Sequence, residues 1–218
     1  MAESTLLFSE IRNVQKFMRD ETIVPQGESA TCWYEVVHGA VRVCQYHSDG
    51  RRQIIGFAFP GDVVGLEWGM RQSCAEALVP SQLFRHDLSD LSLRMGGVPT
   101  AVNGEHPALE SALAAAHQSI ALLGLPTALE RVAGFLLALA RRLNCGTLLC
   151  LPMPRVDIAD YLGLTMHTVS RTMSELVRRG LIALDAPNRA RILAPEHLGE
   201  LAGFDFPEDT VGEAQLVA

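Results

Sequence analysis

Residues 157–180, DIADYLGLTMHTVSRTMSELVRRG, contain the pattern that decides the fold. Helical periodicity begins near Asp157, stops at Gly163 and resumes after Thr165, because glycine readily adopts a left-handed turn and threonine is a preferred N-cap. This spacing predicts two helices that cross closely, with the second held outward, as in a helix-turn-helix. The side chains expected to face the core are Ile158, Ala159 and Leu162 in the first helix and Val169, Met173, Leu176 and Val177 in the second.

The outward face of the second helix indicates what the motif binds. An ordinary helical hairpin also needs a small residue and a glycine turn, so the turn alone does not identify a function. Here the outward positions form a polar and cationic strip, and the first turn can bring His167, Ser170 and Arg171 to base edges. Residues 181–195 then predict two short strands around residues 186–188, a wing. We therefore expect DNA binding, through a strip of Met166, His167, Ser170, Arg171 and Arg178.

Residues 22–79 carry the signals of a β domain. Short valine, isoleucine and aromatic runs are separated by glycines at positions 27, 39, 50, 61 and 65. Regular turns at roughly 11-residue spacing are typical of a sandwich or barrel. Residues 48–50, Ser-Asp-Gly, predict a hairpin turn, because such residues tolerate positive φ.

Residues 106–125 predict a helix with an apolar seam. Pro107 suits its first turn, and apolar side chains recur at alternating steps of three and four residues, as in a coiled coil. Such a stripe is usually the core side of a helix, but here alanine and leucine occur on several faces, which favours pairing with a second subunit. Thr127 and Glu130 predict the capped start of the next helix. The seam residues are Leu109, Leu113, Ala116, Ile120 and Leu123.

Composition excludes several classes of protein. The net charge of −7 argues against a protein that coats nucleic acid indiscriminately, and all but one (Lys16) of the 18 basic residues are arginine. No apolar run approaches the roughly 18 residues that span a bilayer, and no signal peptide is evident, so we expect a cytoplasmic protein that does not contact a membrane. The five cysteines are widely spaced and predict free thiols, with no metal site.

The chain resembles the Crp/Fnr superfamily of transcription regulators, and within it the FixK-type branch. The likeness spans residues 20–198 and rests on several motifs in one order: GAVRV, SDGRRQI, FPGDVVGLE, CAEAL, TALERVAGFLLALARRL and the stretch from Leu151 to Thr172. The resemblance implies an α+β fold: an N-terminal double-stranded β-helix (jelly-roll, cyclic-nucleotide-binding-like) sensor domain, a long dimerisation helix and a C-terminal winged helix-turn-helix. The expected boundaries are 1–98, 99–125 and 126–218.

The resemblance also implies partners and contacts. A homodimer would bind double-stranded DNA at a palindrome of TTGAT-like half-sites and act on RNA polymerase, in microaerobic or nitrogen-fixation circuits. Ser170 and Arg171 match the pair that reads the half-site, with Arg171 on guanine, and Arg155 matches a phosphate contact. His167 departs from the family, which usually has glutamate, so direct base reading and a backbone contact both stay open. Thr165 and Thr168 complete the expected DNA-binding set.

An effector is less well supported than DNA. Relatives that respond to cyclic AMP hold its ribose and phosphate with residues of one loop. In this chain the corresponding loop is shorter and has Gln72 after Arg71, so we expect no bound cyclic AMP. The iron–sulfur branch needs an N-terminal cysteine cluster, and the first 31 residues contain no cysteine. Three alternatives stay open. The protein could be regulated by its abundance or by cysteine oxidation, it could bind a small molecule in the β domain, or it could bind haem through His38, His47, His86 or Cys74. An enzyme is not expected, since no third ligand joins His38 and His47. The candidate pocket is Glu67, Arg71, Gln72 and Ser73, with no resident cofactor expected.

Overall fold

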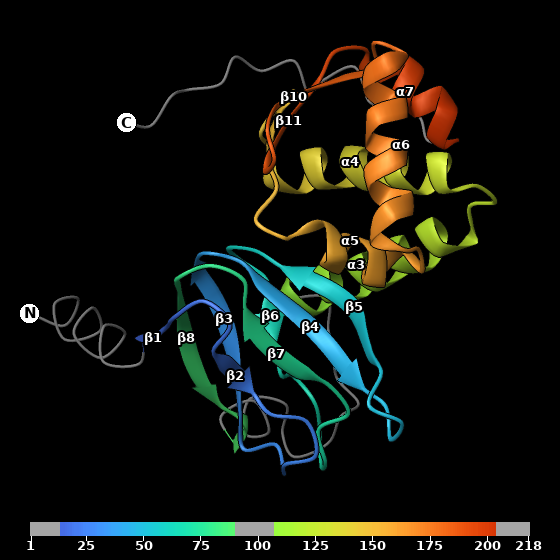
Figure 1. Cartoon of the computed structure of the whole chain (residues 1–218). Helices are drawn as coiled ribbons and strands as arrows, with labels where there is room; N and C mark the ends of the chain where they lie inside the picture. Colours follow the sequence, from blue (N-terminus) through green and yellow to red (C-terminus); the bar gives the residue numbers. More distant parts are fainter. Residues whose placement is uncertain (1–13, 90–106, 204–218) are drawn as a thin grey trace, which may run out of the picture. The chain divides into compact units, whose positions relative to one another are not determined.

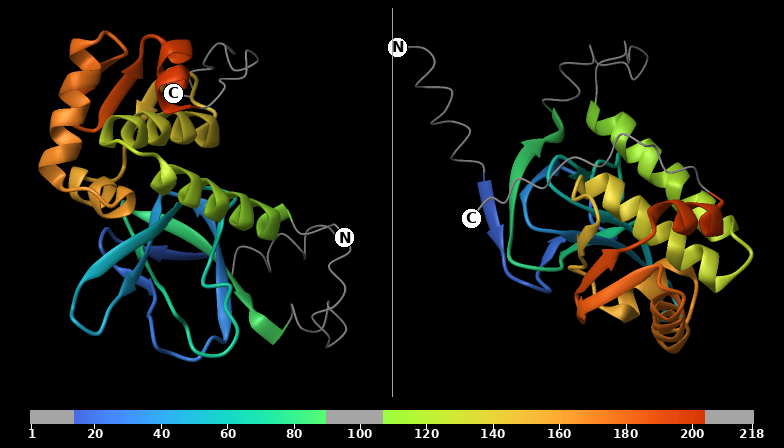
Figure 2. Two further views of the ribbon diagram at one scale, coloured as in Figure 1. Left: turned by 90° about the vertical axis from the view of Figure 1, so that its right-hand side faces the viewer. Right: turned by 90° about the horizontal axis from the view of Figure 1, so that it is seen from above.

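The computed structural model describes residues 14–89 and 107–203 (Figures 1 and 2). Two compact units, Met1–Ala116 and His117–Ala218, meet within one helix, α3 (Pro107–Gly124). The helix predicted over residues 106–125 is therefore confirmed to within one residue at each end. The domain boundaries expected from the sequence stay predictions.

The first unit is a β roll made of two four-stranded antiparallel sheets. The strand order in one sheet is β1 (Val14–Phe17), β8 (Ser81–Asp87), β3 (Cys32–His38) and β6 (Val63–Val64). The order in the other is β2 (Thr22–Val24), β7 (Cys74–Ala77), β4 (Val41–Tyr46) and β5 (Arg52–Ala58).

Alternating side chains from both sheets form the core of the roll. In β3 the buried residues are Cys32, Tyr34 and Val36, with their neighbours turned to the other face, the period of two that a half-buried strand requires. Val41 and Ala77 oppose them from the second sheet, and all five belong to one buried cluster. The predicted hairpin at residues 48–50 is confirmed: Gly50 has φ +82° and joins β4 to β5.

The β region extends beyond the predicted residues 22–79 at both ends. Strand β1 begins at Val14 and pairs with β8, which ends at Asp87 and also pairs with β3. Neither strand is bounded by the regular glycines on which the prediction relied. In β8 the structure buries Ser81 and Leu83 in alternation, but the polar Ser81 hides this period of two in the sequence.

The second unit is a winged helical domain built around α4 (Ala128–Leu143), whose N-cap Thr127 accepts a hydrogen bond from the Glu130 amide at 3.2 Å. The remaining elements are α5 (Arg155–Leu162), α6 (Met166–Arg178), α7 (Pro195–Ala202) and a sheet ordered β10 (Ile182–Ala186), β11 (Arg189–Ile192) and β9 (Leu148–Cys150). Helix α4 packs against α6 and α7, and α6 runs along the outside of the unit next to β10 (Figures 1 and 2).

The predicted helix-turn-helix is confirmed, with one correction to its core. Gly163 adopts the left-handed conformation (φ +63°), and the Leu164 amide donates to the Ala159 carbonyl at 2.9 Å. Val177, expected in the apolar face of α6, is 39% exposed, whereas Thr172 is only 8% exposed. The buried face of α6 is therefore Val169, Thr172, Met173 and Leu176, rotated from the predicted face so that Thr172 is included and Val177 is left out.

Candidate nucleic-acid interface

Helix α6 begins at a cap that uses two of the residues predicted to bind DNA. The Thr165 hydroxyl accepts a hydrogen bond from the Thr168 amide at 3.1 Å, and the two hydroxyl oxygens lie 2.9 Å apart. This pairing satisfies an amide that the helix start leaves without a carbonyl partner. Both threonines therefore fix where α6 starts, and their contact with DNA stays a prediction.

The outward strip of α6 is exposed as predicted. Met166, His167, Ser170 and Arg171 all lie on the solvent side of the helix. Arg171 makes no hydrogen bond or ion pair with any residue in the described ranges 14–89 and 107–203, so its guanidinium is held only by its own stem. A shallow hollow beside it is lined by Ser170, Arg171, Ser174, Glu175 and Arg178.

Farther along α6, Glu175 holds two arginines. Its carboxylate accepts from Arg178 at 2.7 and 2.8 Å and from Arg179 Nε at 2.7 Å. These hydrogen bonds lower the pKa of Glu175 to about 2. The sequence prediction named Arg178 and missed this clamp, although the three- and four-residue spacings are those of facing helix side chains.

Arg155, whose contact with phosphate stays a prediction, reaches the tip of the wing. Its Nη2 donates to the Pro187 carbonyl at 3.4 Å. Its Nη1 is buried and has no hydrogen-bond partner among the described residues, and burial lowers the pKa of the guanidinium. Arg155 thus joins the start of α5 to the turn between β10 and β11, with donor capacity left over.

The predicted wing is confirmed as the hairpin of β10 and β11. Ala190 is fully buried, while Arg189 and Arg191 on either side of it are exposed. Arg191 Nη2 lies 2.6 Å from Asp185 on the facing strand. The wing therefore presents arginines outward, one of which is already paired.

Helix α3 leaves much of the predicted seam uncovered. Leu113 is 57% exposed, Ile120 68% and Leu123 38%, and Ala116 is also exposed; the side chain of Leu109 lies outside the described residues. Leu122, on the opposite side of the helix, is buried, and Ser119 meets the Tyr161 hydroxyl of α5 at 2.8 Å. Among the described residues, α3 thus has one face that packs on its neighbours and one apolar face that is exposed.

The four residues of the candidate effector pocket come together in the β roll but bind one another and the backbone. Glu67 accepts from the Gln72 amide and the Ser73 hydroxyl, each at 2.6 Å. Arg71 is 5% exposed and donates to the Cys32 carbonyl at 2.7 Å. Its Nε is buried without a hydrogen-bond partner among the described residues.

The candidate haem ligands do not gather at one place. His86 stacks on Trp33 with ring centres 3.9 Å apart and lies 3.4 Å from Glu35. Cys74 is on β7, in the other sheet. No group of three histidine, cysteine or acidic residues that could hold a metal ion occurs within the described residues. The described helices also include none that is long and apolar enough to cross a membrane.

Comparison with known proteins agrees with this architecture. Residues 14–92 match the cyclic nucleotide-binding domain family, and residues 130–201 match the Crp-like helix-turn-helix domain family. The nitrogen fixation regulation protein FixK of Rhizobium meliloti is 38% identical over 194 residues, covering 87% of each chain. FixK of Azorhizobium caulinodans is 42% identical over 183 residues, covering 81% of this chain and 73% of the relative.

A solved structure supports the same assignment. FixK2 from Bradyrhizobium japonicum superimposes with a TM-score of 0.78 at 38% identity, covering 86% of this chain and 96% of that one. The motif order, the β roll, the winged helix-turn-helix and these similarities lead to one conclusion: the chain belongs to the Crp/Fnr family of transcription regulators, in its FixK-type branch.

Proposed function

We propose that the protein binds palindromic operators with TTGAT-like half-sites as a homodimer and activates transcription there. The observation that carries this proposal is Arg171, an exposed arginine on the outward face of α6 without a partner in the described part of the chain. A guanidinium can donate two parallel hydrogen bonds to O6 and N7 of guanine, the commonest specific contact in the major groove. Ser170 is adjacent and equally exposed.

The other arginines of α6 suit a different role. Arg178 and Arg179 share the Glu175 carboxylate, so their positive charge is partly neutralised before any DNA arrives. Such charges contribute to phosphate binding, which fixes orientation but carries no sequence information. Arg171 therefore specifies the operator, while Arg178, Arg179 and the wing arginines add affinity.

The proposed dimer forms along α3. Large apolar side chains at Leu113, Ile120 and Leu123 are exposed, and burying them against a second copy of the helix would remove apolar surface from water. Their spacing of seven and then three residues lets two copies interdigitate as in a coiled coil. A two-fold dimer presents two α6 helices to the DNA, which matches a palindrome.

Regulation is proposed to work without cyclic AMP, an iron–sulfur cluster or another resident cofactor. A cyclic phosphate needs free donors, yet Arg71 is directed at the Cys32 carbonyl and Glu67 is occupied by Gln72 and Ser73. Binding a nucleotide there would first break these three contacts. Equilibrium dialysis of the full chain with cyclic AMP should therefore detect no saturable binding.

The names of the relatives suggest the regulated process. FixK of Rhizobium meliloti is called a nitrogen fixation regulation protein, and the 34% identical AadR of Rhodopseudomonas palustris a transcriptional activatory protein. We infer activation through RNA polymerase at promoters of microaerobic or nitrogen-fixation genes. In vitro transcription from a template with a selected operator would test this directly.

The central experiment is selection of bound sequences from a random DNA pool by the full chain, with and without reductant. The expected product is a palindrome with guanine at a fixed position in each half-site. Sedimentation of the free protein at micromolar concentration should show a dimer, and Ile120→Glu should shift it to a monomer that still folds. Enrichment of unrelated sequences, or a stable wild-type monomer bound once per half-site, would refute the proposal.

A further inference from the structure

Cys44 and Cys74 face each other across two neighbouring strands of the β roll. They are register partners in the antiparallel β4–β7 ladder and form its last pair. Directly opposed residues in such a ladder have Cα atoms about 4.5–5.5 Å apart, within the range that a disulfide can join. Both thiols are free, with Cys44 fully buried and Cys74 4% exposed.

Cys44 and Cys74 are buried, yet they lie where the backbone can adjust. On its other side Cys44 borders a bulge, since the register between β4 and β5 shifts between Val43 and Cys44. Bulges disrupt a ladder locally, and terminal pairs of a ladder open at lower free energy than central ones. The pair therefore has room to adjust its backbone, and small solutes can reach it when the end of the ladder opens.

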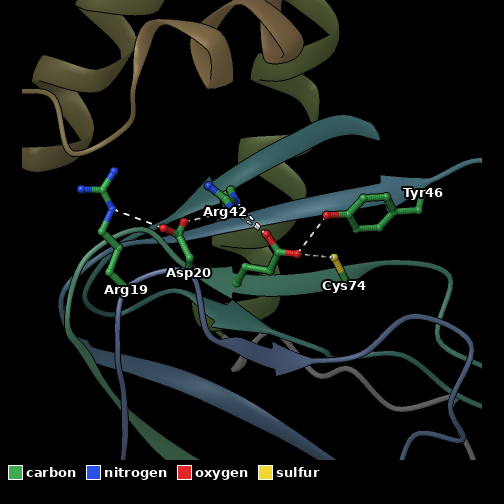
Figure 3. Close-up of polar contacts among 6 residues, drawn as sticks. Arg19, Asp20, Arg42, Tyr46 and Cys74 are labelled. Carbon is green, nitrogen blue, oxygen red and sulfur yellow. Dashed lines mark hydrogen bonds and ion pairs between the residues drawn. The ribbon is translucent and has the colours of Figure 1, made fainter. Parts of the chain in front are cut away.

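Cys74 lies at one end of a polar network and joins it through the Glu76 carboxylate (Figure 3). Its sulfur lies 3.8 Å from Glu76 Oε1, and the same carboxylate accepts from the Tyr46 hydroxyl at 3.0 Å. Arg42 lies 2.7 Å from the second oxygen of Glu76 and 3.2 Å from Asp20, which in turn contacts Arg19. Burial raises the pKa of Tyr46 to about 12, so this hydroxyl stays a donor at ordinary pH.

The two thiols are not equivalent. The interaction between the two side chains lowers the pKa of Cys74 more than burial and Glu76 raise it. The same interaction, together with burial, raises the pKa of Cys44. Cys74 is therefore the thiol that ionises first, and Cys44 is the one that keeps its proton beside it.

We propose that Cys44 and Cys74 form a reversible dithiol that hydroperoxides oxidise to an intramolecular disulfide. The inference goes beyond the DNA-binding function and does not depend on it. The other cysteines lack such a partner: Cys32 is opposite Asp87, Cys150 is opposite Arg189, and Cys145 precedes β9. Their surroundings provide no opposed sulfur in register.

The chemistry balances in two steps. The Cys74 thiolate attacks one oxygen of hydrogen peroxide, so that an S–O bond forms, the O–O bond breaks and water leaves once the released hydroxide takes a proton. The Cys44 sulfur then attacks the sulfenic acid, forming the S–S bond and expelling a second water. Overall, two thiols and one hydrogen peroxide give one disulfide and two waters, with two electrons passing from sulfur to the peroxide.

The test uses the reduced full chain, exposed anaerobically to stoichiometric hydrogen peroxide. Intact mass should fall by two hydrogens, peptide mapping without reductant should join the segments that contain Cys44 and Cys74, and dithiothreitol should restore the original mass. Cys74→Ser should slow thiol loss by about tenfold or more, since it removes the ionised thiol. Cys44→Ser should instead leave a sulfenic acid on Cys74 that dimedone captures.

Cys150→Ser is the matched control, because it removes an exposed thiol and keeps the pair. It should form the same intramolecular disulfide at the wild-type rate. The wild-type peptide map needs no variant, so it decides the question even if a serine variant folds poorly. A disulfide that joins any other cysteines, a link between two chains through Cys150, or retention of all five thiols would overturn the proposal.

Discussion

In the β roll, Arg42 and Arg71 turn inward onto partners, whereas in the second unit Arg171 lies exposed on α6 with no partner in the described chain. The same side chain therefore serves two purposes, which its position in the sequence does not reveal. Arg42 neutralises the largely buried Glu76 and Arg71 satisfies a buried carbonyl. Of these three arginines, Arg171 alone has no partner among the described residues, and this availability of its donor fork marks it as suited to read DNA.

The largest expected effect comes from removing Arg42, one of the two inward-facing arginines of the β roll. Arg42→Met should destabilise the β roll by about 3–5 kcal/mol, because it leaves the Glu76 carboxylate largely buried without its cationic partner, while the neutral Tyr46 hydroxyl and Cys74 thiol still donate to it. Both tryptophans, Trp33 and Trp68, lie in this unit, so their fluorescence during urea unfolding reports on it alone.

Two further variants sharpen this first prediction. Arg19→Met removes a guanidinium that is 66% exposed and should cost less than about 1 kcal/mol, as exposed pairs do. Adding Glu76→Gln to Arg42→Met should recover part of the loss, since no buried charge then remains. Equal unfolding midpoints for Arg42→Met and Arg19→Met would mean that Arg42 contributes no more than a surface residue.

The second prediction concerns the outward arginine. Arg171→Ala should remove the preference for guanine in each half-site, at a cost of about 1–3 kcal/mol per contact. Fluorescence anisotropy with the selected operator and with a guanine-substituted one measures this preference. Arg171→Lys retains the charge without the bidentate fork, so it should keep general affinity but lose discrimination. An unchanged guanine preference in the alanine variant would reject the assignment.

The third prediction concerns Arg178 and Arg179, which are exposed but paired with Glu175. Glu175→Gln should release Arg178 and Arg179 for phosphates, strengthening binding to every sequence and steepening the salt dependence by about one unit per recruited arginine. The affinity ratio between operator and random DNA should stay near the wild-type value, because phosphate contacts strengthen binding to both alike. Glu175→Asp, which keeps the charge, provides the control, and a salt slope that matches wild type in the glutamine variant would contradict the clamp.

The direction in which the pKa of Glu175 is shifted determines how its ion pairs with Arg178 and Arg179 depend on pH. Hydrogen bonds from Arg178 and Arg179 lower the pKa of Glu175 to about 2, so the carboxylate is favoured and is lost only as the pH falls toward that value. The salt slope of the wild-type protein should therefore gain nothing from Glu175 between pH 8 and pH 5. Measuring the slope at both pH values, with the glutamine variant as reference, checks this expectation.

The smallest expected effect is at His167, which lies exposed in the first turn of α6. If it touches a base, His167→Glu should change the selected sequence at one position per half-site, by on the order of 1 kcal/mol. A backbone contact would instead weaken binding to all sequences by repelling phosphate. We expect the base contact, because residue 167 lies two positions after the cap. Identical selected motifs for the two proteins would reject it.

The sequence by itself determined the helix-turn-helix and its outward strip. Gly163, the Thr165 cap and the spacing of the apolar residues act through contacts within a few positions of one another, so a single stretch contains nearly all the information. The turn at residues 48–50 and the capped start of α4 were predictable for the same reason. The likeness to FixK-type regulators extended these local features to the whole chain.

Tertiary structure alone decided which distant residues meet. Strand alternation can place Arg42 and Cys44 on one face of β4, but not assign Glu76 and Cys74 as their partners, since register depends on hydrogen bonds between strands about 30 residues apart. Likewise, the sequence placed Arg71 in a candidate pocket, and only the fold shows that it donates to the Cys32 carbonyl. Helical contacts are local and strand pairings are not, so the sequence identified the outward strip of α6, while the structure was needed to bring Cys44 and Cys74 together.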